Sequence, residues 1–140
     1  MSTTVGDLMT PHAVSLAPDA TIQSAAKLMR DDIFGAVPIV DSNNALVGIV
    51  TDRDIVVKAI AEGRGLDTPV SDIMTRNPQT APRDATIEQA MRIMAAAQIR
   101  RIPVVESGRL IGMLSIGDIA TTVPDTSVAG TVLEHVSERS

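Results

Sequence analysis

The sequence predicts an α+β fold built from two tandem repeats, each with the element order β-α-β-β-α. Two observations carry this prediction. The 140-residue chain matches itself at an offset of 65 residues, which becomes 64 after a loop. Each copy alternates runs of helical spacing with short runs typical of strands. Because a copy of about 60 residues buries little apolar surface alone, we expect the two to pack through their sheets about a pseudo-two-fold axis.

Five pairs of matched segments define the repeat. They are 5–10 with 70–75, 19–22 with 84–87, 37–40 with 102–105, 46–51 with 110–115, and 54–55 with 118–119. The matches place repeat 1 at 5–62 and repeat 2 at 70–122, joined by a polar linker at 63–69 that contains glycine and proline. A tail at 123–140 follows the second repeat.

Each repeat should open with a short extended piece and a helix. The extended pieces lie near Ala13–Leu16 and Gln79–Ala81. Thr86 and Gln89 have the spacing of a capping box, and Thr21 stands at the equivalent place, so a helix should begin after each threonine. The apolar residues that then recur at helical spacing are Ile22, Ala25, Ala26, Met29 and Ile33 in repeat 1, and Ile87, Ala90, Met91 and Met94 in repeat 2.

Two strands and a second helix complete each repeat. The strands are 36–40 and 46–51 in repeat 1, and 102–105 and 110–115 in repeat 2, each pair separated by turn residues. In repeat 1 the second helix should run over Arg53–Glu62 and stop at Gly63.

The tail carries apolar residues at helical spacing. Val128, Val132, Leu133 and Val136 would share one face of a helix. Such a face suits docking or contact in a dimer. The alternatives are recruitment of a partner protein or a frayed end.

The composition excludes several classes of function. With no cysteine, the chain has no disulfide, thiolate metal site or cysteine nucleophile. A net charge of −5 argues against broad binding to nucleic acid or anionic lipid. No apolar run approaches the roughly 20 residues that span a bilayer, and Met1–Met9 lacks the basic flank and apolar core of a signal peptide. We therefore expect a soluble, cytoplasmic protein with no membrane contact.

Catalytic patterns are missing as well. His12 and His135 lie far apart in the sequence and have no metal-site spacing. The chain contains no Gly-x-Ser-x-Gly elbow and no Walker loop. Phe34 is the only aromatic residue, so a planar ligand would be held by aliphatic side chains and backbone. The sequence therefore favours binding without catalysis.

The strongest chemical pattern lies at two strand-to-helix junctions. Thr51-x-x-Asp54 and Ser115-x-x-Asp118 each follow an apolar strand and open a helix. A helix start favours anions, a hydroxyl can donate to a phosphate oxygen, and an acid one turn on can accept from ribose hydroxyls. The alternative is a plain N-cap, because Ser and Thr are favoured caps and an early acid offsets the helix dipole.

Two arginines form the second pattern. Arg100 and Arg101 precede the buried strand of repeat 2, at the place of Gly35-Ala36 in repeat 1. Arginine suits bidentate contact with phosphate. Adjacent strand residues face opposite ways, so one arginine is expected to point into a given cleft. The alternative is a pair of solvated charges at a strand end.

The duplicated segments resemble a tandem pair of cystathionine-β-synthase-type (CBS) domains, a Bateman module. The resemblance covers about 5–122 and rests on Val5–Thr10, Val37–Asp41, Leu46–Val50 and Thr51-x-x-Asp54, each with its second copy. The stretch Thr51–Lys58 further resembles small stand-alone CBS proteins of the hypoxic response type. The resemblance implies adenine nucleotides bound in two clefts between the repeats, and homodimerisation into a flat disc.

The resemblance also implies roles for single residues. The two hydroxyl-x-x-acid pairs would contact phosphate and ribose. The base would be framed by groups near Val14, Ser15, Ala36 and Val37, and near Gln79, Thr80, Arg101 and Ile102. In related modules, basic residues before the second proline-bearing strand reach the first acid, so Arg100 and Arg101 would serve the Asp54 cleft.

The expected function is a regulatory sensor without catalysis. AMP, ADP or ATP would shift the geometry of a homodimer, and an unidentified partner protein would respond to the change. We expect the Asp54 cleft to prefer phosphates, and the Asp118 cleft to be weaker or to hold adenosine-like ligands. The alternative is a structural or interaction protein with empty or vestigial clefts, acting through a dimer surface or the 123–140 tail. Direct binding of nucleic acid is disfavoured by the lack of a basic stripe.

Overall fold

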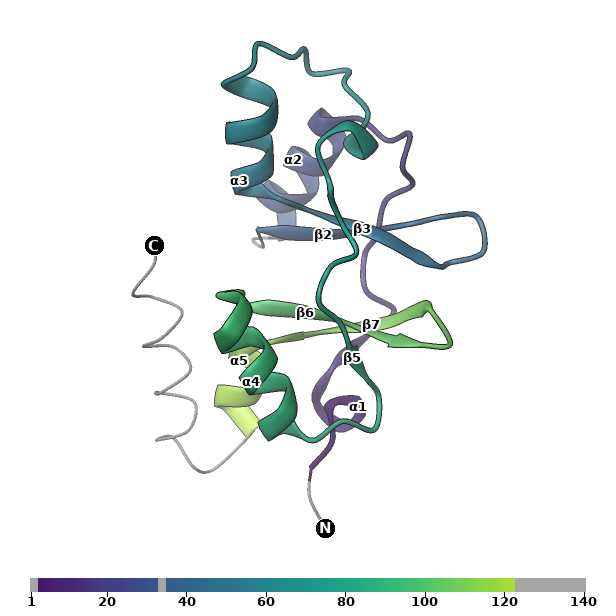
Figure 1. Cartoon of the computed structure of the whole chain (residues 1–140), viewed down its shortest axis with the longest axis vertical. Helices are drawn as coiled ribbons and strands as arrows, with labels where there is room; N and C mark the ends of the chain where they lie inside the picture. The colour runs from purple at the N-terminus through teal and green to yellow at the C-terminus, as the bar shows by residue number, and fades with distance from the viewer. Residues whose placement is uncertain (1–2, 33–34, 123–140) are drawn as a thin grey trace. The chain divides into compact units, whose positions relative to one another are not determined.

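A computed structural model describes the chain over residues 3–32 and 35–122, in two compact units (Figure 1). Unit 1 comprises Met1–Ala13 with Gln79–Ser140, and unit 2 comprises Val14–Pro78. The amphipathic pattern predicted for 123–140 lies outside the described residues. Each unit has its own sheet, helices and hydrophobic core.

Unit 2 contains a three-stranded antiparallel sheet. Its strand order is β2 (Ala36–Val40), β3 (Leu46–Thr51) and β4 (Thr75–Arg76). Leu16 adds a parallel bridge to Ile39 at the free edge of β2. The helical elements are α2 (Ile22–Asp32), α3 (Asp52–Asp54), its continuation η1 (Ile55–Ile60), and the 3-10 turn η2 (Val70–Asp72). α2 and α3 lie on one side of β2 and β3 (Figure 1).

Local sequence signals explain the elements of unit 2. β2 and β3 have the predicted bounds, and Asp41 closes the turn between them by accepting from Asn43 N–H at 2.8 Å and Ala45 N–H at 3.0 Å. α2 begins after Thr21, whose hydroxyl accepts from Ser24 N–H at 3.1 Å. The buried core is aliphatic, with one methionine: Ile22, Ala25, Val37, Ile39, Val50, Ala59, Val70, Ile73 and Met74.

Unit 1 contains a four-stranded sheet. Its strand order is β1 (Thr10–Pro11), β7 (Arg109–Ser115), β6 (Arg101–Glu106) and β5 (Ala81–Pro82), and only β5 and β6 are parallel within this sheet over the described residues. Its helices are α1 (Val5–Leu8), α4 (Ile87–Ala97) and α5 (Ile116–Thr122). The predicted capping box forms at α4: Gln89 N–H donates to Thr86 Oγ1 at 3.1 Å, and Thr86 N–H donates to Gln89 Oε1 at 2.9 Å. Side chains from all three helices and from the strands share one aliphatic core.

The opening segment of each repeat lies in the unit that holds the rest of the other repeat. α1 and β1 belong to repeat 1 by sequence, yet β1 pairs with β7 in unit 1. In the same way η2 and β4 open repeat 2, yet β4 pairs with β3 in unit 2. The compact units therefore have bounds that differ from those of the sequence repeats. The predicted α+β fold of tandem repeats is confirmed, with this exchange of short segments added to it.

The helix after β3 departs from the α-helix predicted over Arg53–Glu62. After a single α turn it continues over Ile55–Ile60 as a π-helix, and Ala61 N–H donates to the Val56 carbonyl at 2.9 Å. The segment ends near Gly63, which has a φ of +75° as a glycine stop requires. π segments are rare and are often found at functional sites.

Candidate functional site

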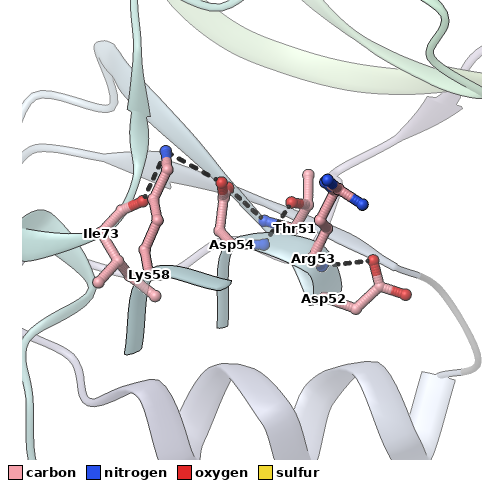
Figure 2. Close-up of polar contacts among 6 residues, drawn as sticks. All are labelled: Thr51, Asp52, Arg53, Asp54, Lys58 and Ile73. Atoms are coloured by element: carbon pink, nitrogen blue, oxygen red, sulfur yellow. Dashed lines mark hydrogen bonds and ion pairs between the residues drawn. The ribbon is translucent and has the colours of Figure 1, made fainter. Parts of the chain in front are cut away.

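In unit 2 the hydroxyl and the acid of Thr51-x-x-Asp54 bond to each other's backbone. Thr51 is the last residue of β3, and Asp54 ends the first helical turn. Asp54 N–H donates to Thr51 Oγ1 at 3.0 Å, and Thr51 N–H donates to Asp54 Oδ2 at 3.0 Å (Figure 2). The oxygen of the hydroxyl is the acceptor here, so its hydrogen is left to donate to a ligand oxygen.

Lys58 completes the arrangement around Asp54. Its Nζ lies 3.1 Å from Asp54 Oδ1 and donates to the carbonyl of Ile73 at 3.4 Å (Figure 2). The side chain of Asp54 is 10% exposed and that of Lys58 is 48% exposed. A buried carboxylate is costly unless it is paired, and the ammonium supplies the pairing charge. Lys58 is absent from the predicted site residues, although its i,i+4 spacing from Asp54 was a usable signal.

Arg53 adds a second cation at the same helix start. Figure 2 shows the side chains of Thr51, Arg53 and Asp54 on one side of the segment, while that of Asp52 points away from them. Arg53 is exposed, so its guanidinium is accessible to a ligand. The residue at the corresponding place in repeat 2 is Gly117. The charges that accompany the two hydroxyl–acid pairs therefore differ.

The other residues predicted for unit 2 differ in what they offer a ligand. Ala36 pairs with Thr51 across β2 and β3, which places it beside the pair. Val37 is wholly buried, and its contact with a ligand stays a prediction. Val14 is exposed and Ser15 is half-buried, in the segment that leads to the bridge with β2. The register thus joins Ala36 to the site, and contact of Val14 and Ser15 with a ligand stays a prediction.

The second hydroxyl–acid pair has the same geometry in unit 1. Asp118 N–H donates to Ser115 Oγ at 3.0 Å, and Ser115 N–H donates to Asp118 Oδ2 at 3.0 Å. Arg101 pairs with Ser115 across β6 and β7, and the carbonyl of Arg100 accepts from Ile116 N–H at 3.0 Å. The structure therefore places the start of β6, where the two arginines lie, next to this pair.

The remaining residues predicted for unit 1 lie around its strands and α4. Ile102 is wholly buried, and its contact with a ligand stays a prediction. Gln79 lines an apolar hollow beside α4 together with Arg92, Ile93, Ala96 and Ala97. Thr80 is half-buried just before β5. The base-framing roles of Gln79 and Thr80 stay predictions, as does the reach of the two arginines to the acid of unit 2.

Two features are absent from the ranges 3–32 and 35–122. No helix within them has the length and apolar character of a membrane span. Nor do these ranges contain a group of three or more His, Asp or Glu side chains placed to hold a metal ion.

The sequence matches a known family over both repeats. The CBS domain model matches residues 5–60 and 70–125. Hypoxic response protein 1 of Mycobacterium tuberculosis is 32% identical over 127 residues, which cover 90% of this chain and 89% of that protein. A crystal structure of Hypoxic Response Protein I with two coordinated zinc ions has a TM-score of 0.81 and 32% identity, covering 87% of this chain and 100% of that chain.

Two other similar structures hold adenosine compounds. CBSX2 in complex with AMP has a TM-score of 0.77 and 30% identity, covering 89% of this chain and 98% of that chain. The CBS domain pair of protein MJ0100, in complex with 5′-methylthioadenosine and S-adenosyl-L-methionine, has a TM-score of 0.76 and 31% identity, covering 86% of this chain and 95% of that chain. With both repeats matched by the family model, the chain belongs to the CBS domain family as a tandem CBS-domain pair.

Proposed function

We propose that this protein is a non-catalytic regulatory module that binds adenine nucleotides of the AMP, ADP and ATP class. The observation that carries the proposal is the geometry shared by the two hydroxyl–acid pairs. In each unit a hydroxyl and a carboxylate at a strand-to-helix junction are held by each other's backbone N–H at 3.0 Å. The ligand class is suggested by relatives, since CBSX2 is described with AMP and MJ0100 with two adenosine derivatives.

The groups of each pair fit two parts of a nucleotide. The hydroxyl retains its hydrogen for a phosphate oxygen. The carboxylate has about four lone-pair positions, so it can still accept from vicinal ribose hydroxyls while it accepts from a backbone N–H. In unit 2 the exposed guanidinium of Arg53, two residues after Thr51 at the same helix start, suits a phosphate (Figure 2). Each pair therefore offers one group for phosphate and one for sugar.

The site at Thr51 is proposed as the one that prefers phosphorylated ligands. It carries Arg53 and Lys58, where repeat 2 has Gly117 and Thr122. Arg100 and Arg101, at the start of β6, are proposed to add further positive charge to it. The site at Ser115 and Asp118 is proposed to be weaker for phosphates or to hold adenosine-like ligands.

A second candidate function is that of a structural or interaction protein whose nucleotide sites are empty or vestigial. One observation favours it. The helical segment η1 exposes three large apolar side chains, with Val56 at 59%, Val57 at 45% and Ile60 at 54% exposure. Apolar side chains gathered on a surface often mark a contact with another protein. A homodimer and a cytoplasmic location are part of both proposals.

A thermal-shift panel separates these candidates. The ligands are AMP, ADP, ATP, NAD and S-adenosylmethionine, because a ligand that binds only the folded state raises its stability. At a hundredfold excess over Kd the gain is about 2.7 kcal/mol, which is readily measured as a rise in Tm. The nucleotide proposal predicts a dose-dependent rise with AMP, ADP or ATP. A flat response to the whole panel would favour the interaction protein, and mass spectrometry of nucleotide released from denatured protein is the independent check.

A further inference from the structure

Lys58 holds the second oxygen of Asp54. The carboxylate accepts from Thr51 N–H at 3.0 Å through Oδ2, and Lys58 Nζ lies 3.1 Å from Oδ1. The ammonium is itself tied, because it donates to the carbonyl of Ile73 at 3.4 Å, and Ile73 is buried at 1% exposure. Figure 2 shows the lysine side chain extending from the helix to both acceptors. The carboxylate is therefore fixed from both of its oxygens.

Burial of Asp54 makes its contact with Lys58 important. The side chain of Asp54 is only 10% exposed, so little water can stabilise its charge or hold the carboxylate in place. Each carboxylate oxygen has two lone-pair positions, so one contact at each oxygen leaves one position on each. Two positions on a carboxylate of fixed orientation are what the two hydroxyls of a ribose need. Lys58 is half exposed, so it can keep this contact without being buried itself.

Repeat 2 has no lysine at the position that corresponds to Lys58. The position that matches Lys58 is Thr122, which carries no charge. The backbone differs as well, because Lys58 lies in the π-helix Ile55–Ile60 whereas α5 (Ile116–Thr122) is α-helical. We propose that Lys58 is a positioning residue that orients the Asp54 carboxylate and balances its charge for the ribose diol of a nucleotide in unit 2. This rests on the proposed nucleotide function, and it predicts stronger selection of ribose over deoxyribose in unit 2 than in unit 1.

The test compares AMP with 2′-deoxy-AMP at the unit 2 site alone. Calorimetry uses a parent chain with Ser115→Ala and Asp118→Ala, so that only the site at Asp54 titrates. Lys58→Met should reduce the ratio of AMP affinity to 2′-deoxy-AMP affinity by about tenfold, the size of one hydrogen bond to a charged group. Lys58→Arg keeps the positive charge and should restore most of the ratio. A purely structural role for Lys58 would lower both affinities together and leave the ratio unchanged. Lys27→Met, at the exposed lysine of α2, should leave the ratio unchanged.

The outcomes separate this proposal from the proposed function. If the parent chain binds AMP and Lys58→Met keeps the full ratio, the positioning role is overturned and the nucleotide function stands. If the wild-type chain binds no AMP, both are overturned.

A spectroscopic readout needs no variant of the lysine. The sequence contains two lysines, so labelling with [ε-13C]lysine gives two side-chain signals to follow by NMR. Saturation with AMP should shift the Lys58 signal, with a smaller shift for 2′-deoxy-AMP, and leave the Lys27 signal in place. A Lys58 signal that does not move while AMP saturates the site would overturn the proposal, even if Lys58→Met failed to fold.

Discussion

Met74 lies where a side chain on Gly48 would have to be. A Cβ built on Gly48 would come within 2.5 Å of Met74 Sδ and 3.0 Å of the carbonyl oxygen of Thr75. The same relationship recurs in unit 1, where a Cβ on Gly112 would lie 2.7 Å from Met9 Sδ and 2.7 Å from the carbonyl oxygen of Thr10. Because Gly48 and Gly112 have no side chain, strand β4 can lie against the β2–β3 hairpin and strand β1 against the β6–β7 hairpin.

Alanine at either glycine should destabilise the fold. We expect Gly48→Ala and Gly112→Ala each to lower the free energy of unfolding by about 1–3 kcal/mol, the usual cost of overpacking, because a backbone carbonyl cannot turn aside as a side chain does. Urea unfolding followed by circular dichroism measures it. Gly117→Ala is the control, since its Cβ would meet nothing nearer than Ser115 Oγ at 3.5 Å and alanine favours a helix. Unchanged stability in both strand variants would contradict the close approach.

Capping and ligand binding can be separated with three matched variants. Thr51→Ala, Ser115→Ala and Thr86→Ala each remove a hydroxyl that accepts from a backbone N–H at 3.0 to 3.1 Å, so each should cost about 1 kcal/mol of stability. Thr86 has no proposed ligand contact. AMP should therefore raise the Tm of Thr86→Ala as much as that of the wild type, and raise the Tm of the other two less. An equal loss of the AMP effect in all three would show that destabilisation alone explains it.

The two acids should differ in their importance for AMP. Asp54→Ala should reduce the affinity for AMP about tenfold or more, whereas Asp118→Ala should have a smaller effect, because the site at Asp54 is proposed to prefer phosphates. Calorimetry on the two variants separately gives both values. Asp52→Ala is the control, since Asp52 points away from the pair (Figure 2). Equal losses of AMP affinity at the two acids would rule out the asymmetry.

Asp7 should make stability depend on pH on the acid side. Hydrogen bonds from Thr4, first from its backbone N–H at 3.0 Å and then from its hydroxyl, lower the pKa of Asp7 below its ordinary value of 3.8. A carboxyl whose pKa is lower in the folded state adds stability above the unfolded pKa, and this is lost as pH falls through the folded pKa. Asp7→Asn should therefore have a lower Tm than the wild type at pH 7, with the gap closing below about pH 4. A gap that stays constant down to about pH 3 would contradict this linkage.

The hairpins could be predicted from the sequence because their strands are long enough to show a pattern. β2 and β3 have the predicted bounds, and α4 begins at the predicted cap of Thr86. β1 and β4 could not be predicted, because each has two residues and no periodicity. Their pairing with the hairpins depends on packing at Gly48 and Gly112, which no local propensity records.

The candidate site could be predicted in part. The reciprocal bonds of Thr51 and Asp54 follow from capping-box spacing, as they do in the second pair. The contact of Lys58 could not be derived fully, because its second acceptor, Ile73, lies 15 residues further along the chain and is brought there by folding. The π-helix that carries Lys58 has no sequence signal of its own, and an α-helix was the natural expectation.

Titration of AMP by calorimetry into the wild type, Thr51→Ala, Ser115→Ala and the double variant tests the central claim most directly. We expect the wild type to bind AMP, Thr51→Ala to bind it about tenfold more weakly, Ser115→Ala to lose less, and the double variant to bind it most weakly, while Thr86→Ala keeps the wild-type affinity. No AMP bound to the wild type, or wild-type affinity for AMP in the double variant, would contradict the proposed site.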